Sequence, residues 1–149
     1  RRIGRSNEIL EETFIYMTDG MRFDRPTIFS PHAGGTIQGD AAMAEAMKNV
    51  FGYDPQWQPW CYNSRPLHGH AIGASGIIET VALLESMKYG LVLPSPVEDS
   101  EFPWIKSPTK CEGIPEPQHF TEHCLGMKVS VGMGGSYSCL VFEHKRPVV

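Results

Sequence analysis

The sequence predicts an α/β fold in which a mixed sheet is packed by helices in layers. Predicted helices and strands alternate along most of the 149 residues, which is typical of this class. Glycine-rich loops follow the predicted strands, and ligands of open α/β sheets bind at such strand ends. The composition is 41% hydrophobic and shows no internal repeat, so we expect one domain spanning residues 1–149.

Net charge and hydropathy exclude several classes of protein. The formal net charge of −4 and the pI near 5.8 argue against nucleic acid or an anionic membrane as the main partner, since both require clustered positive charge. No apolar run approaches the roughly 18 residues of a membrane span. The polar, arginine-led start is not typical of a secretory signal. We therefore expect a soluble protein of the cytoplasm or of an organelle matrix.

The first third of the chain predicts helix, strand and helix. Apolar residues recur at helical spacing over residues 7–18, and Gly20 ends that pattern. Residues 26–30 (PTIFS) form a compact strand that leads into the glycine-rich loop PHAGGTIQGD. A second helix is predicted from about Asp40 to Gly52.

The middle of the chain predicts a strand over residues 57–62, a helix over residues 71–87 and a short strand over residues 91–94. The helix over residues 71–87 leaves almost no polar stripe, so we expect it to lie in the middle of a protein. Gly73 and Gly76 in its first turns suggest that another backbone passes close by.

Proline and glycine shape the last third of the chain. Six prolines between residues 94 and 117 predict that residues 95–126 form a long surface loop without regular structure. Residues 128–131 and 138–142 are then expected to pair as a hairpin around the stretch VGMGGSY.

Two residues at the helix over residues 71–87 suggest chemistry. Its apolar run contains one charge, Glu79, and a buried carboxylate needs a partner, for which Arg65 is the nearest candidate in sequence. His70 precedes the helix, and the positive field of a helix N-terminus lowers the pKa of an imidazole. We therefore expect a neutral His70, the state that a general base requires.

The four cysteines are expected to be reduced, because a chain of this size with a good core does not need disulfides. Cys111, His119, His123 and Cys124 are of types that bind zinc. However, Cys111 has no close cysteine mate and His123 is adjacent to Cys124, so the spacing favours a surface loop. We expect no metal site.

Three loops taken together resemble the carboxy-terminal half of β-ketoacyl synthases, the condensing enzymes of fatty acid and polyketide synthesis. PHAGGTIQGD resembles the family's motif HGTxTxxGD, and NSRPLHGHAIGASGIIE resembles a lysine followed by GHxxGAxGxxE. VGMGGSYSCLVF resembles the hairpin GFGGTN. The resemblance covers about residues 8–143 with the motifs in order. It implies the carboxy-terminal half of a thiolase-like fold that lacks its first strand.

The resemblance also implies catalytic roles. His32 and His70 would face a cysteine thiolate that carries the acyl chain, help decarboxylate a malonyl-type extender and stabilise the enolate. Glu79 would be the buried acid that pairs with the basic residue of the motif, here Arg65. The reaction implied is the condensation of an acyl thioester with a malonyl-type unit carried on acyl carrier protein.

Further positions follow from the same motifs. Gly34 and Thr36 would lie along the pantetheine arm of the carrier protein, and no other cofactor is implied. The backbone N–H of Met133, beside Gly134 in the hairpin, would be one donor of the oxyanion hole and the side chain would take the place of a gate.

Three departures from the family pattern favour an alternative. Gly34 replaces a threonine that would bond pantetheine, Arg65 replaces a lysine with a planar fork, and Met133 replaces a gating phenylalanine. The alternative function is a non-catalytic scaffold or chain-length-factor-like partner of a condensing enzyme.

No cysteine of this chain has the setting of the family's nucleophile, which lies at a strand-to-helix elbow in the amino-terminal half. We therefore expect either one subunit of a split ketosynthase or the carboxy-terminal piece of a cleaved one, with a partner chain that carries the amino-terminal half and supplies the cysteine. The assembly would be a hetero-oligomer built on a ketosynthase-type dimer.

Overall fold

The computed structural model describes residues 4–21, 26–51, 59–92, 118–120 and 123–145. Helices and strands alternate along these residues, as the sequence predicts. In chain order they are α1 (Gly4–Thr18), β1 (Thr27–Ser30), α2 (Ile37–Phe51), β2 (Trp60–Cys61), α3 (Arg65–His68), a 3₁₀ turn η1 (Ile72–Ala74), α4 (Ser75–Tyr89), β3 (Leu91–Val92), β4 (Gln118–His119), β5 (Cys124–Gly132) and β6 (Ser136–His144).

The main sheet is mixed, with the strand order β2-β1-β5-β6. Strand β1 pairs in parallel with both β2 and β5, and β5 pairs antiparallel with β6. The predicted hairpin is confirmed, and it is longer than predicted because its pairing runs from Cys124 opposite His144 to Gly132 opposite Ser136. A second, small sheet joins β3 to β4.

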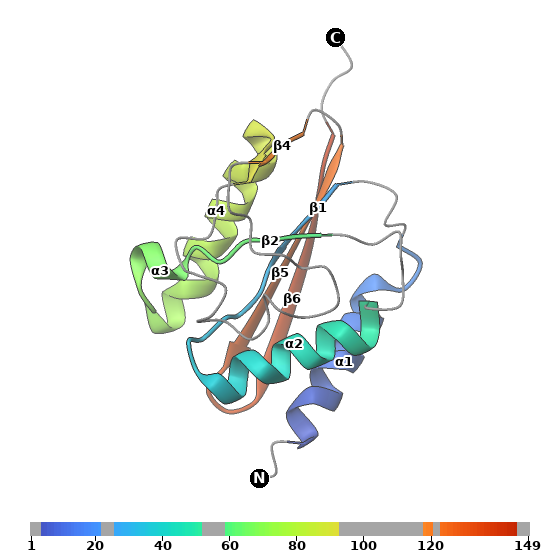
Figure 1. The fold of residues 1–149 in the computed structure, drawn as a ribbon, viewed down its shortest axis with the longest axis vertical. Helices are drawn as coiled ribbons and strands as arrows, with labels where there is room; N and C mark the ends of the chain where they lie inside the picture. Colours follow the sequence, from blue (N-terminus) through green and yellow to red (C-terminus); the bar gives the residue numbers. More distant parts are fainter. Residues whose placement is uncertain (1–3, 22–25, 52–58, 93–117, 121–122, 146–149) are drawn as a thin grey trace.

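Helices cover both faces of the sheet (Figure 1), so the predicted layers are confirmed. Helices α1 and α2 lie side by side on one face, where Phe14 packs against Phe29 and Phe51 with ring centroids 5.9 and 5.4 Å apart. Helix α4 lies on the other face, where Leu83 and Met87 are buried in a second core cluster. Strand β5 lies between these layers, and its first six residues are all buried.

Helix α4 packs on the sheet through a narrow stripe. The buried residues of this stripe are Ser75, Glu79, Leu83, Ser86 and Met87. At Gly126 of β5 the packing is so close that an added Cβ atom would lie 3.2 Å from both methyl groups of Leu83. The glycine therefore sets the distance between α4 and the sheet.

The apolar residues on the other side of α4 are exposed, so the described residues alone do not place this helix in the middle of a protein. We call this side the outer face of α4; it consists of Ile77, Ile78, Val81 and Leu84. The exposed fraction is 71% for Ile77 and 55% for Val81, so these side chains have no cover within the described residues. No helix in the described part of the chain has the length and hydropathy needed to cross a membrane.

Two further predictions need correction. The loop expected over residues 95–126 includes β4 and the start of β5, because pairing with distant strands overrides local composition there. Residues 93–117 of that loop lie outside the described residues. Close approach at the helix start is found only at Gly76, where an added Cβ atom would lie 3.1 Å from the Ser130 hydroxyl, whereas the same position at Gly73 faces open space.

Candidate active site

The two predicted histidines meet where β1 ends and α4 begins. His32 lies two residues after β1, and His70 lies two residues before η1. The centroids of their imidazole rings are 6.0 Å apart, and the ring planes are nearly perpendicular at 78°. The two histidines that the resemblance places at one site therefore lie side by side.

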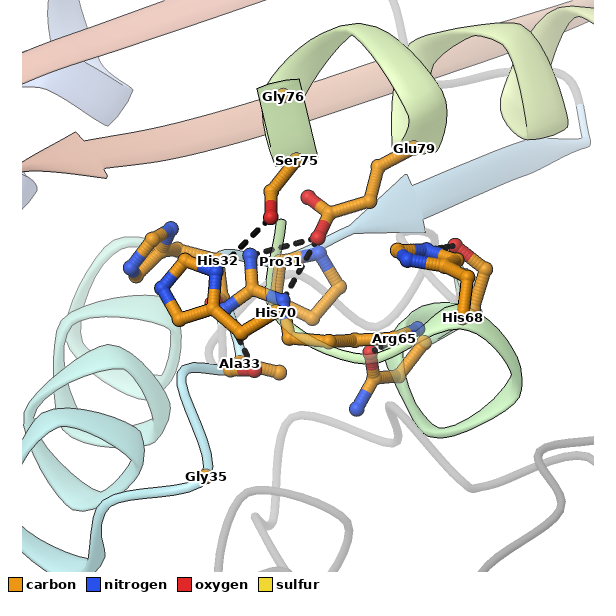
Figure 2. A network of polar contacts seen from close by, with 12 residues as sticks. Pro31, His32, Ala33, Gly35, Arg65, His68, His70, Ser75, Gly76 and Glu79 are labelled. Atoms are coloured by element: carbon orange, nitrogen blue, oxygen red, sulfur yellow. Dashed lines mark hydrogen bonds and ion pairs between the residues drawn. The ribbon is translucent and has the colours of Figure 1, made fainter. Parts of the chain in front are cut away.

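The predicted ion pair between Arg65 and Glu79 is also present (Figure 2), and both side chains are buried. The Nε and Nη2 atoms of Arg65 lie 2.7 and 2.6 Å from the same carboxylate oxygen, Oε1. The side chain of Asn63 accepts a bond from the backbone N–H of Arg65 at 3.1 Å, at the first residue of α3. A short polar turn thus aims the guanidinium at α4.

Arg65 also holds the loop that carries His32. Its Nη1 atom donates to the backbone carbonyl of His32 at 2.8 Å and to that of Ala33 at 3.0 Å. The planar guanidinium presents several donors in a fixed fork, so one side chain can bind Glu79 and the loop together. Arg65 therefore ties the loop of His32 to Glu79 on α4.

Lys128 is a site residue that the sequence reasoning missed. It lies in β5, and its side chain is 1% exposed. Its Nζ atom lies 2.5 Å from the second oxygen of Glu79, Oε2, so the carboxylate is shared between two cations. The sequence feature that could have pointed to it is a lone lysine between Met127 and Val129 in an apolar strand. We call these three residues the Arg65–Glu79–Lys128 cluster.

The environment of His32 favours the neutral imidazole. The pKa of His32 is lowered from an ordinary 6.5 to about 4, chiefly by burial and then by the positive charges of Arg65 and Lys128. A neutral imidazole at physiological pH can donate one hydrogen bond and accept another. The sequence predicted this state for His70 from the field of the helix, and for His70 it stays a prediction.

His70 is oriented by the first residue of α4. Its Nδ1 atom lies 2.8 Å from the hydroxyl of Ser75, a buried residue that sequence reasoning also missed (Figure 2). This bond leaves Nε2 as the ring nitrogen available to a substrate. Between the two residues, Ile72 has a φ of +47°, a conformation that β-branched residues rarely adopt. Backbone strain of this kind is typical of functional sites.

Two cavities adjoin His32. The larger, of about 490 Å³, lies between the start of α4 and the β5–β6 hairpin and is lined by Lys128, Ser130 and Tyr137 among others. The smaller, of about 300 Å³, is lined by both histidines and by the start of α2. It includes Gly34 and Thr36, so the structure brings these two predicted residues to the histidines.

The remaining predicted positions lie in the β5–β6 turn. Met133 and Gly134 lie in the turn of the hairpin, and the side chain of Met133 is 93% exposed. Neither is among the described residues that line the two cavities. Their roles in an oxyanion hole and a gate stay predictions.

Of the possible zinc ligands, Cys111 lies outside the described residues. Among the described residues, no three metal-binding side chains converge.

Comparison with known proteins supports the resemblance. The family model "Beta-ketoacyl synthase, C-terminal domain" matches residues 19–97, just over half of the chain. A 5-methyl-1-naphthoate synthase of Streptomyces sahachiroi is 31% identical over 93% of this chain. The chloroplastic 3-oxoacyl-[acyl-carrier-protein] synthase I of Hordeum vulgare is 28% identical over 86% of it. The chain spans only 8% and 26% of the lengths of these two relatives.

A solved structure has the same fold. It is that of a type II polyketide synthase acyl-carrier protein in complex with its ketosynthase (AntDE:AntF), with a TM-score of 0.70 and 20% identity. The match covers 93% of this chain and 33% of the matched chain. The expected thiolase-like, carboxy-terminal fold is therefore confirmed, and this chain is part of a larger domain.

Replacement of Glu79 tests the cluster. Glu79→Gln leaves two buried cations without their shared anion, so we expect the free energy of unfolding to fall by about 3 kcal/mol in urea titrations followed by circular dichroism. Glu85→Gln is the matched control on the same helix, since Glu85 is exposed and its pairing with Lys88 at 3.5 Å should contribute less than about 1 kcal/mol. Equal losses in both variants would contradict the assignment.

Proposed function

Because this chain belongs to the β-ketoacyl synthase family, as its C-terminal domain, we propose that it contributes both histidines to the active site of a condensing enzyme. The reaction is the decarboxylative Claisen condensation of an acyl thioester with a malonyl-type unit on acyl carrier protein. The observation that carries this proposal is the pair of imidazoles 6.0 Å apart beside a cavity, with the His32 loop held by a buried cluster.

The proposed reaction requires neutral imidazoles whose N–H groups donate hydrogen bonds to a developing negative charge. When the bond between the malonyl carboxylate and the α-carbon breaks, carbon dioxide leaves and the electron pair moves to the thioester oxygen. The N–H groups of neutral His32 and His70 would stabilise that enolate oxygen. The α-carbon then attacks the acyl thioester and the cysteine thiolate leaves. The lowered pKa of His32 supports this role.

The cysteine nucleophile is proposed to come from a partner chain that carries the amino-terminal ketosynthase half. Cys61 and Cys124 are fully buried, and burial raises the pKa of the Cys139 thiol to about 12. A thiol with a raised pKa is a poor nucleophile, because the thiolate is the reactive form. No cysteine among the described residues lines either cavity beside His32.

The outer face of α4 is the surface proposed to receive this partner. Exposed apolar patches of this kind mark interaction sites. Ile77 and Val81 of the outer face also line the larger cavity, which reaches His32. A partner that covers this face would therefore close the cavity and bring a nucleophile to the histidines.

Acyl carrier protein is the second proposed partner. The smaller cavity is open to its pantetheine arm along Gly34 and Thr36, while the Thr36 hydroxyl also accepts a bond from the N–H of Gly39 at 3.2 Å. The ketosynthase of the AntDE:AntF structure is in complex with an acyl-carrier protein, which supports this partner. We propose that the complete assembly is a hetero-oligomer built on a ketosynthase-type dimer.

A non-catalytic role as scaffold or chain-length-factor-like partner is the second candidate. The exposed Met133 favours it, because the side chain at the gate position makes little contact within the described chain. The two candidates differ in whether the histidines act in decarboxylation.

Replacement of His70 separates the two candidates. In the complex with the partner, His70→Ala should lower carbon dioxide release from malonyl-acyl carrier protein by about 100-fold or more, because a positioned imidazole contributes about that factor. His68→Ala is the matched control, since the exposed His68 bonds to Ser64 at 3.3 Å and lies outside both cavities. Unchanged release in His70→Ala would remove His70 from the mechanism.

Charge on the outer face of α4 tests the docking surface. The double variant Ile77→Asp with Val81→Asp should lose the complex with the partner in size-exclusion chromatography with light scattering. Ile37→Asp is the control, because Ile37 is 83% exposed at the start of α2 and away from the outer face. If the double variant still forms the complex, or if Ile37→Asp loses it too, the docking surface is assigned wrongly.

A further inference from the structure

Lys128 is a buried cation for which none of the three motifs provides a role. It lies in the middle of β5, and its neighbours Met127 and Val129 are fully buried in the core. An ammonium group in such a place is costly unless it is paired and fully hydrogen-bonded. Its contacts therefore indicate what it does.

The ammonium group of Lys128 has three partners, as many as it has N–H donors. It lies 2.5 Å from Oε2 of Glu79, donates to the carbonyl of Val129 at 2.8 Å and donates to the carbonyl of Pro31 at 3.2 Å. The last contact joins β5 to the residue immediately before His32.

Lys128 and Arg65 divide the backbone of the His32 loop between them. Lys128 binds the carbonyl of Pro31, and Arg65 binds the next two carbonyls, those of His32 and Ala33. The same two cations divide the carboxylate of Glu79, with Oε1 against the arginine and Oε2 against the lysine. Three successive carbonyls are thus fixed by two cations that one buried anion holds in place.

The cluster carries one negative and two positive charges, so its net charge beside His32 is positive. Both cations act to lower the pKa of His32 and Glu79 acts to raise it. The charged and titratable groups around His32 come from several elements; they are Arg65 on α3, Glu79 on α4, Lys128 on β5, His70 before η1, Asp40 on α2 and Tyr137 on β6.

We propose that Lys128 is a positioning residue for His32, which fixes the loop at Pro31 and supplies the second positive charge beside the imidazole. The guanidinium of Arg65 binds Oε1 of Glu79 and the carbonyls of His32 and Ala33. The compact ammonium of Lys128 binds Oε2 of Glu79 and the carbonyl of Pro31. The catalytic role of His32 rests on the proposed function. The contacts of Lys128 with the loop of His32 do not depend on it.

The test is the pH titration of His32 in the full chain, labelled with ¹³C-histidine and followed by NMR, with His32→Gln to assign the signal. Removal of a nearby cation favours the protonated imidazole, so Lys128→Met should raise the proton affinity of His32 at least tenfold. Lys128→Arg, which restores the charge, and Lys88→Met, which removes an exposed lysine, should both titrate as the unaltered chain does.

A second variant covers loss of folding. If Lys128→Met does not fold, Lys128→Gln keeps an amide donor for the carbonyl of Pro31, removes the charge and should show the same rise. The proposal would be overturned if a folded Lys128→Met or Lys128→Gln variant kept the proton affinity of His32 within twofold of the unaltered chain. An equal rise in Lys88→Met would overturn it too. The His32 titration needs neither partner nor turnover. It can therefore support the role of Lys128 even if the His70→Ala measurement contradicts the proposed function, and it can contradict that role even if the proposed function holds.

Discussion

The shared carboxylate of Glu79 is the interaction on which the candidate site depends. It joins α4 to α3 through Arg65 and to β5 through Lys128. The two cations in turn bind the carbonyls around His32. Because removal of one partner from a buried ion pair is strongly destabilising, the position of His32 is tied to the packing of α4 on the sheet.

Helix α4 is unusual because the charged Glu79 faces inward while the apolar residues of the outer face are exposed. The inward stripe holds Glu79 for the cluster and Ser75 for His70. The outward residues Ile77 and Val81 adjoin the larger cavity. One helix thus links the electrostatics of the histidines to the surface proposed for the partner, and this arrangement explains why its sequence shows no polar stripe.

Much of the fold and part of the site could be predicted from the sequence. The resemblance implies that His32 and His70 face one cysteine, and the need of a buried carboxylate for a partner predicts the pair of Arg65 with Glu79. Lys128 could not be predicted, since a lysine in an apolar strand reveals no partner when that partner is distant in sequence. The apolar run of α4 indicates burial without indicating which chain buries it, so the particular residues of the outer face could not be assigned from the sequence.

In the proposed reaction this chain supplies histidines to a cysteine that lies on a partner. Peptide mass spectrometry of the complex after incubation with an acyl thioester tests this placement of the cysteine. We expect an acyl adduct on a cysteine of the partner chain, which is lost when malonyl-acyl carrier protein is added. An adduct on a cysteine of this chain, or no adduct on either chain, would rule this placement out.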